Sequence, residues 1–261
     1  MAYTNSPLAT YKKISPNKTT PRNHAIDTLT IHCFVGQVTA KRGCEAFQSK
    51  SKQASCNYVV GHDGSIGLCV EEKDRSWCSS NKANDHRAIT FEVASDTRHP
   101  YAVTDKALNA LIDLIVDVCK RNGKKKVLWF ADKNKTLAYN PKPDEMVMTV
   151  HRWFAAKACP GDYLYEKHGY IADEVNKRLG SEQNATENSS EPQKQTKTPF
   201  KVKVIIDDLN YRNEPYMSGK VLGVTGKGIF TITEEKNGWG KLKSGAGWIY
   251  LENPKYCTIL N

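Results

Sequence analysis

A histidine, a lysine and a cysteine occur within nine residues of the chain, at His151, Lys157 and Cys159, and Pro160-Gly161 follows directly. Imidazole and thiolate are the side chains that zinc binds best in proteins. A Cys-Pro-Gly sequence does not continue a helix, so we expect the cysteine on a turn that folds back towards the histidine. An ordinary core cysteine at the end of a helix is the alternative interpretation of this spacing.

Two ligands do not make a metal site, so a third has to come from another part of the chain. The best candidate is His32, which lies in the apolar run 29–35 and is therefore expected on a strand. His62 or His86 is a reserve ligand if His32 lies elsewhere.

The early strand with its histidine and the later block His…Lys-x-Cys-Pro-Gly resemble those of type-2 N-acetylmuramoyl-L-alanine amidases. The resemblance extends over about residues 25–180, and the later block is its most specific part. It implies a catalytic Zn2+ held by His32, His151 and Cys159. The reaction implied is hydrolysis of the amide bond between N-acetylmuramic acid and L-alanine in peptidoglycan.

The resemblance also implies the catalytic side chains. Lys157 matches the position of the family's catalytic lysine, whose positive charge would stabilise an oxyanion. The strand 87–93 is similar to the family's IGIE strand, which places Glu92 beside the metal as a proton acceptor. An ion pair with Arg87 is the alternative for this acid, because a carboxylate inside an apolar strand needs a partner. Some members use a tyrosine where this chain has Cys56, which leaves the division of catalytic roles between Glu92 and Lys157 open.

Two further segments imply contacts with the substrate. Residues 55–66 predict a strand, an Asp-Gly turn and a second strand, and they match the family's Tyr-Val-Val hairpin. Residues 70–79 resemble the segment with the motif AWHAG, which shapes one wall of the family's substrate cleft, and a cysteine replaces its histidine here. A plain core aromatic is the alternative for the tryptophan of this segment. The predicted substrate contacts are Asn57, Tyr58, Trp77 and Cys78.

The elements around these residues predict an α/β catalytic domain over residues 1–180, with a central mixed β-sheet flanked by helices. Continuously apolar residues 27–35 predict a central strand. The clearest helix begins after Thr104 as its N-cap and has apolar residues at helical spacing. The other expected elements are an extended segment at 1–24, a weak helix at 41–52, a short strand at 126–130, a polar loop at 135–143 and a closing helix at 169–180.

The last third of the chain has a different character. Residues 181–199 contain almost no apolar side chains and are expected to be a linker. Residues 200–261 have short β-rich runs between glycine turns, which predicts a small all-β barrel. This part resembles bacterial SH3-like domains, which implies cell-wall binding, with core packing as the alternative for the tryptophans. The candidate wall-binding residues are Tyr211, Arg212, Trp239 and Trp248.

Composition restricts the partners. A net charge of +10 predicts an acidic partner, and anionic cell-wall polymer fits this charge as well as nucleic acid does. We expect no nucleic-acid partner, because no nucleic-acid-binding motif is present. We expect no membrane insertion, because no apolar run approaches the roughly 18 residues of a span. The eight cysteines form no C-x-x-C pair, and no separate zinc finger is expected. Six of them are expected as buried thiols or small polar fillers: Cys33, Cys44, Cys56, Cys69, Cys78 and Cys119.

The N-terminal residues have no features of an export signal. We therefore expect synthesis in the host cytoplasm and action on the wall after release through a pore, or from outside. This combination is typical of a phage or prophage endolysin that lyses a Gram-positive host. The alternatives are a non-catalytic peptidoglycan-recognition module, a basic wall-binding adaptor and a peptidoglycan peptidase. The sequence indicates no oligomeric state.

Overall fold

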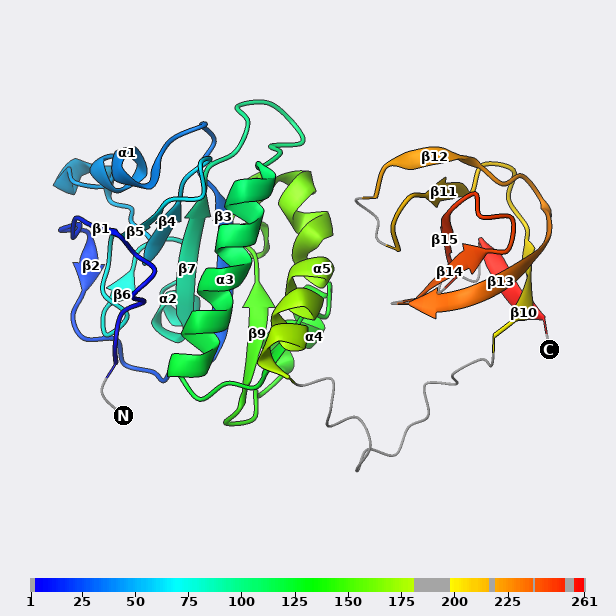
Figure 1. Ribbon diagram of the computed structural model, residues 1–261. Helices are drawn as coiled ribbons and strands as arrows, with labels where there is room; N and C mark the ends of the chain where they lie inside the picture. Colours follow the sequence, from blue (N-terminus) through cyan, green and yellow to red (C-terminus); the bar gives the residue numbers. More distant parts are fainter. Residues whose placement is uncertain (1–2, 181–197, 216–218, 237, 252–255, 261) are drawn as a thin grey trace. The chain divides into compact units, whose positions relative to one another are not determined.

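The computed structural model describes residues 3–180, 198–215, 219–236, 238–251 and 256–260 (Figure 1). The chain divides into two compact units, residues 1–186 and residues 187–261, and each is described by itself. Residues 181–197 of the predicted linker lie outside the described residues.

A seven-stranded mixed sheet in the order β1-β5-β4-β7-β3-β9-β8 forms the centre of the first unit (Figure 1). The central strand β3 is buried along its whole length, as its continuous apolar character predicts. It pairs in parallel with β7 and with β9, so the carboxyl ends of the three strands meet at one edge. The strands are β1 (Tyr11–Lys12), β3 (Thr28–Cys33), β4 (Tyr58–Val60), β5 (Ile66–Leu68), β7 (Ala88–Val93), β8 (Lys126–Leu128) and β9 (Glu145–Thr149).

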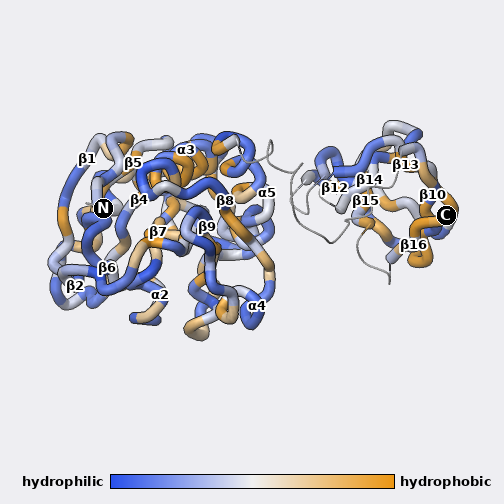
Figure 2. Tube along the Cα trace, turned by 90° about the horizontal axis from the view of Figure 1, so that it is seen from below, coloured by the Kyte–Doolittle hydropathy of each residue, from blue (hydrophilic) through white to orange (hydrophobic). Residues whose placement is uncertain are grey.

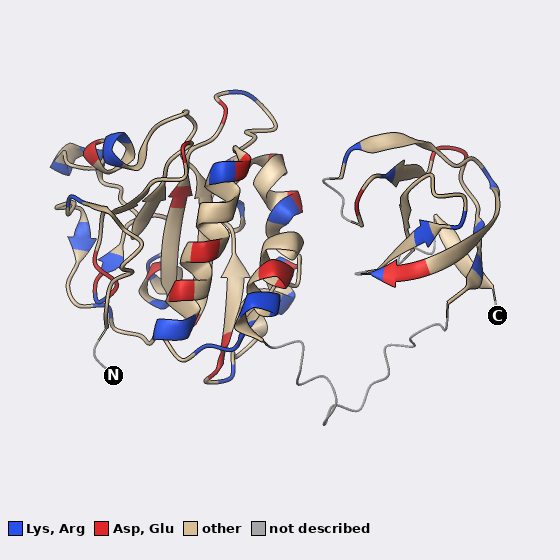
Figure 3. Ribbon diagram, viewed as in Figure 1, with Lys and Arg blue, Asp and Glu red and all other residues tan. Residues whose placement is uncertain are grey.

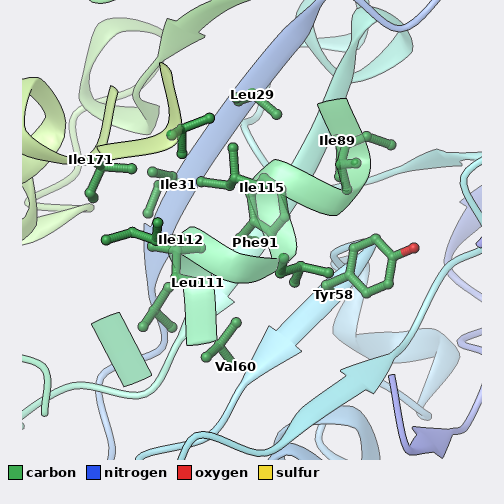
Figure 4. Close-up of a cluster of buried hydrophobic side chains, with 14 of the residues drawn as sticks. Leu29, Ile31, Tyr58, Val60, Ile89, Phe91, Leu111, Ile112, Ile115 and Ile171 are labelled. Carbon is green, nitrogen blue, oxygen red and sulfur yellow. The ribbon is translucent and has the colours of Figure 1, made fainter. Parts of the chain in front are cut away.

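The helices α3 (Asp105–Arg121) and α5 (Gly161–Leu179) cover one face of this sheet (Figure 1). Figure 4 shows side chains of α3, among them Ile112 and Ile115, against Ile31 and Phe91 of the strands. Apolar residues gather on the central strands and on α3 in Figure 2, and acidic and basic residues both occur along α3 and α5 in Figure 3. This layer is the main hydrophobic core and fixes the positions of β3 and β7.

Three short helices and two 3-10 turns complete the first unit: α1 (Ala40–Glu45), η1 (Lys50–Lys52), α2 (Lys82–Arg87), α4 (Lys133–Ala138) and η2 (His151–Trp153).

The N-terminal residues 3–24 run as mostly extended chain, as predicted. In this segment β1 pairs with β5, and β2 (Lys18–Thr19) pairs with β6 (Arg75–Ser76). The buried guanidinium of Arg22 donates to four backbone carbonyl groups and ties the segment to the domain.

Two helices differ from the prediction. The predicted polar loop 135–143 contains the end of α4, which forms because the Asp132 side chain accepts a hydrogen bond from the backbone N–H of Lys135. The closing helix α5 begins at Gly161 and not near Gly169. Pro160 is its N-cap residue and has no N–H group that the helix start would leave unsatisfied.

The second unit is a seven-stranded antiparallel sheet in the order β12-β11-β15-β14-β13-β10-β16. Residues of β10 alternate between buried and exposed, so one face of the sheet forms a core around Val202, Ile232 and Ile249. The all-β prediction for this region is confirmed. Its strands are β10 (Phe200–Val204), β11 (Asn210–Arg212), β12 (Val221–Val224), β13 (Gly228–Lys236), β14 (Trp239–Leu242), β15 (Trp248–Tyr250) and β16 (Cys257–Leu260).

Among the helices of the described residues, none combines the length and the apolar character that crossing a bilayer requires.

Candidate metal centre and active site

The first predicted ligand, His32, lies near the carboxyl end of β3 and is almost fully buried. Burial lowers the pKa of His32 to about 3, and the neighbouring His151 acts in the same direction. The imidazole is therefore neutral and keeps a lone pair at ordinary pH. Its Nε2 atom is buried without a hydrogen-bond partner among the described residues. An unpaired buried nitrogen of this kind is costly unless a ligand occupies it.

The other two predicted ligands come from the segment after β9. His151 begins η2, and Cys159 lies on the turn before α5, as predicted. The backbone N–H of Arg152 donates to the carbonyl of Cys159 at 3.1 Å, which closes the loop between them. Cys159 Sγ lies 3.3 Å from Nδ1 of His32, and the two imidazole ring centres are 5.0 Å apart.

One ligand atom from each of His32, His151 and Cys159 lies within 4.8 Å of the other two. Two imidazoles and a thiol are a donor set that zinc prefers, and three protein ligands leave an open coordination position. The hydrogen bond that Cys159 donates to Cys33, together with burial, raises the pKa of the Cys159 thiol. A bound metal would reverse this shift, because a coordinating thiol is deprotonated. The residues present therefore fit a zinc ion.

Glu92 lies on β7 directly opposite His32 in the parallel register. Its Oε2 atom is buried without a hydrogen-bond partner among the described residues, and its Oε1 atom lies 3.8 Å from the thiol of Cys78. Burial raises the pKa of Glu92 well above its ordinary range. The alternative ion pair with Arg87 is absent, because that guanidinium binds both carboxylate oxygens of Asp27 at 2.8 and 2.7 Å. Glu92 is thus available for proton transfer.

Lys157 is exposed on the loop between the two later ligands. Burial lowers the pKa of His151, and the positive charge of Lys157 lowers it further. A catalytic role for Lys157 stays a prediction.

Four residues were predicted to contact the substrate, and the structure corrects two of them. Asn57 is fully buried, and its side chain binds the backbone of β7 and of the loop after β5. Tyr58 is fully buried as well, and its hydroxyl group binds Glu72 and the backbone of Ser6. Both side chains are structural, because their polar atoms are already paired inside the protein.

The other two lie nearer to the surface. Trp77 is half-buried, its Nε1–H donates to Thr19 at 3.0 Å, and Arg75 lies over its ring. Cys78 is half-buried and faces Glu92. The Cys78 thiol, the Glu92 carboxylate and a nitrogen of His32 form a second group of possible metal ligands, whose atoms lie within 4.8 Å of one another. A substrate role for Trp77 and Cys78 stays a prediction.

A polar layer beneath the ligands was not predicted. Thr30 of β3 and Thr149 of β9 are hydrogen-bonded at 2.8 Å, and the side chain of Asn84 bridges both of them. Ser80, whose hydroxyl group lies 2.9 Å from Nε2 of His151, was missed too. The alternation of Thr28, Thr30 and His32 along one strand was the available signal for the layer, since these side chains share one face.

The reserve ligands are not at the centre. Neither His62 nor His86 belongs to the two ligand groups found among the described residues. His86 instead accepts a hydrogen bond from the backbone of Asn23.

In the second unit, a cavity of about 230 Å³ lies near two of the four candidate wall-binding residues, Arg212 and Trp239. Trp248 does not line it: the ring is buried and Lys241 lies over it, so core packing describes this residue. Tyr211 packs partly buried against the core of the unit. The cavity is lined by Ile206, Asp208, Leu209, Asn210, Arg212, Trp239, Tyr250 and Tyr256.

Comparison with solved structures finds chains of low identity. PlyL is 16% identical, with a TM-score of 0.41, and the match covers 63% of this chain and 95% of that chain. The Ph2119 endolysin from the Thermus scotoductus bacteriophage Ph2119 is 14% identical, with a TM-score of 0.43 and coverages of 60% and 89%. The amidase LysCS from Clostridium intestinale is 15% identical, with a TM-score of 0.42 and coverages of 66% and 97%. No curated protein matches the chain.

The comparison with protein families is decisive. The family described as N-acetylmuramoyl-L-alanine amidase matches residues 22–162, which is more than half of the chain. The matched region contains His32, Glu92 and the whole segment from His151 to Cys159. This protein therefore belongs to the N-acetylmuramoyl-L-alanine amidase family and hydrolyses amide bonds of peptidoglycan.

Proposed function

We propose that the first unit is a zinc-dependent amidase that cleaves the bond between the lactyl group of N-acetylmuramic acid and L-alanine. The observation that supports this most strongly is the convergence of His32, His151 and Cys159 from separate segments of the chain. Zinc bound there would polarise the amide carbonyl and lower the pKa of water.

The side chains around the centre have distinct roles in this proposal. The unpaired Oε2 atom of Glu92 accepts the proton of the attacking water and later returns it to the leaving amine. The ammonium group of Lys157 stabilises negative charge on the carbonyl oxygen of the substrate. Cys78 donates its thiol hydrogen to the other oxygen of Glu92 and leaves the reactive oxygen free.

A cavity beside η2 is our candidate for part of the substrate site. It has a volume of about 220 Å³, and Thr149 and Phe154 line it from the two sides of the His151 turn. Asn81 and Asn84 also line this cavity, and their side chains cap α2 and hold the polar layer together, so its shape is fixed by the fold.

The new amino termini that hydrolysis produces identify the cleaved bond. Purified walls are digested with the full chain, and the new amino termini are analysed by mass spectrometry. An amidase exposes L-alanine alone, and removal of zinc with a chelator abolishes the release. New termini at other residues would identify a peptidase. Wall binding without any release would identify a recognition module.

We propose further that the protein is a phage or prophage endolysin for a Gram-positive host and that the second unit, an SH3-like domain over residues 200–261, binds its wall. The cavity with Arg212, Asp208 and aromatic rings supports this proposal, since it offers hydrogen bonds and apolar contact to a polymer.

In an inactive Glu92→Gln background, Arg212→Ala is expected to reduce sedimentation of the full chain with intact walls. Lys227→Ala, on an exposed ion pair away from the cavity lining, is the matched control. Equal sedimentation of both would contradict the assignment.

A further inference from the structure

Ser80 is not among the predicted site residues, but its side chain forms a hydrogen bond with a candidate ligand. Its Oγ atom lies 2.9 Å from Nε2 of His151, across 71 residues of sequence. No hydrogen bond of the described residues involves Nδ1 of this histidine, so Nδ1 is the nitrogen left for a metal. The contact is therefore made on the far side of the ring from the metal position.

The backbone of Ser80 has an unfavourable conformation. Its φ angle is +60°, in the left-handed region where a residue with a Cβ atom is disfavoured. In the resembling segment AWHAG, the matching position is glycine, which adopts this angle without strain. This chain thus has a hydroxymethyl group where a residue without a side chain would be easier to accommodate.

The turn around Ser80 is held from both sides. The buried carboxylate of Asp85 accepts hydrogen bonds from the backbone N–H groups of Cys78 and Ser79, both at 3.1 Å, and from the Ser79 hydroxyl at 2.6 Å. On the other side, the side chain of Asn81 caps α2 through the N–H of Asn84. These contacts fix the backbone of the turn on both sides of Ser80.

We propose that Ser80 is a positioning residue for the metal centre, an inference that rests on the proposed zinc-dependent function. Its hydroxyl oxygen accepts the Nε2–H of His151. This contact selects the tautomer whose lone pair is on Nδ1 and holds the ring in its ligating orientation. The strain of the turn is retained because it places this hydroxyl group.

The test is zinc affinity of the full chain, measured by competition with a chromogenic chelator, for Ser80→Ala and Ser80→Gly. Loss of a hydrogen bond to a metal-bound histidine typically weakens metal binding about 10–100-fold, and we expect both variants to fall in this range. The midpoint of thermal unfolding is measured on the same samples after zinc is removed.

The glycine variant separates positioning from a structural role. Glycine fits a positive φ angle, so metal-free Ser80→Gly should unfold at the same or a higher temperature than the parent while it binds zinc more weakly. Gln53→Gly is the matched control, because Gln53 also has a positive φ angle of +51° and does not belong to the ligand groups. It should bind zinc like the parent.

Each outcome decides the inference. Weaker zinc binding in both Ser80 variants, without a loss of metal-free stability in Ser80→Gly, supports it. A parent that binds zinc while both Ser80 variants bind it equally well overturns the role of Ser80 and leaves the proposed cofactor intact. A parent that binds no zinc overturns the proposed cofactor, and the inference fails with it.

Discussion

Two glutamates of the first unit, Glu72 and Glu92, have their carboxylate groups removed from water in very different surroundings. Glu72 is fully buried, and it accepts hydrogen bonds from the hydroxyl group of Tyr58 and the guanidinium group of Arg121. Glu92 is half-buried, has only the weak thiol donor of Cys78 on one oxygen and has no partner for the other. The carboxylate of Glu72 is thus paired with a cation, whereas that of Glu92 has an oxygen that can take part in a reaction.

The difference indicates which of the two acids is structural. A buried carboxylate that is paired with a cation and a hydroxyl group is engaged inside the protein, and removal of one partner destabilises the fold. A buried carboxylate without a partner destabilises the fold, so it persists where its reactivity is needed. The position of Glu92 beside the candidate ligands agrees with this reasoning.

The largest effect on activity is expected when one of the candidate metal ligands near Glu92 is removed. His151→Ala should reduce hydrolysis of soluble muropeptide below detection and abolish binding of one zinc per chain, because two ligands do not hold a catalytic ion. Zinc content by plasma mass spectrometry and product release are the measurements, and circular dichroism checks the fold. Full activity of this variant would show that the proposed centre is wrong.

A smaller but still large effect on rate is expected from Glu92→Gln. Loss of a general base typically costs a factor of about 10²–10⁴, and zinc content should stay at the parent level. Stability should be equal to that of the parent or higher, because an amide is easier to bury than an unpaired carboxylate. The turnover number and the urea midpoint are measured together. Parent-like turnover would remove Glu92 from the mechanism.

Glu72→Ala should have the opposite effect: lower stability with unchanged turnover. It leaves the partly buried Arg121 with Asp117 as its remaining carboxylate partner, and loss of one partner of a buried pair costs about 3 kcal/mol. Urea unfolding measures this loss. Turnover per folded molecule should match the parent, since Glu72 lies outside the candidate centre. A specific loss of turnover in the folded protein would contradict the division between the two glutamates.

The smallest effect is expected from the neighbouring Glu71, whose partners Lys73 and Lys12 are both well exposed. Such surface pairs contribute up to about 1 kcal/mol, so Glu71→Gln should shift the unfolding free energy by less than this. Lys73 and then Lys12 lower the pKa of Glu71 to about 2. The contribution is therefore present above the unfolded pKa of about 4.3 and is lost as pH falls through about 2. Urea titrations of both proteins at pH 7 and at pH 2 test this; a larger difference at pH 2 would contradict it.

Local sequence was sufficient for the elements that depend on neighbouring residues. The helix α3 begins after its Thr104 cap as predicted, and the Asp-Gly turn joins β4 to β5. The short helix α4 was missed because it has only 6 residues, and its cap Asp132 lies in a segment rich in polar residues. The start of α5 was misplaced because Pro-Gly was interpreted as an end and not as a beginning.

The sequence by itself determined the three candidate ligands, since His32, His151 and Cys159 follow from residue type, spacing and resemblance. Tertiary structure alone decided which other residues belong to the site. Asn57 and Tyr58 lie in a matching segment, but partners distant in sequence bury them. Ser80 and His151 are 71 residues apart, and only the fold brings them together. Burial and long-range hydrogen bonds depend on how strands and helices pack, and no local pattern encodes them.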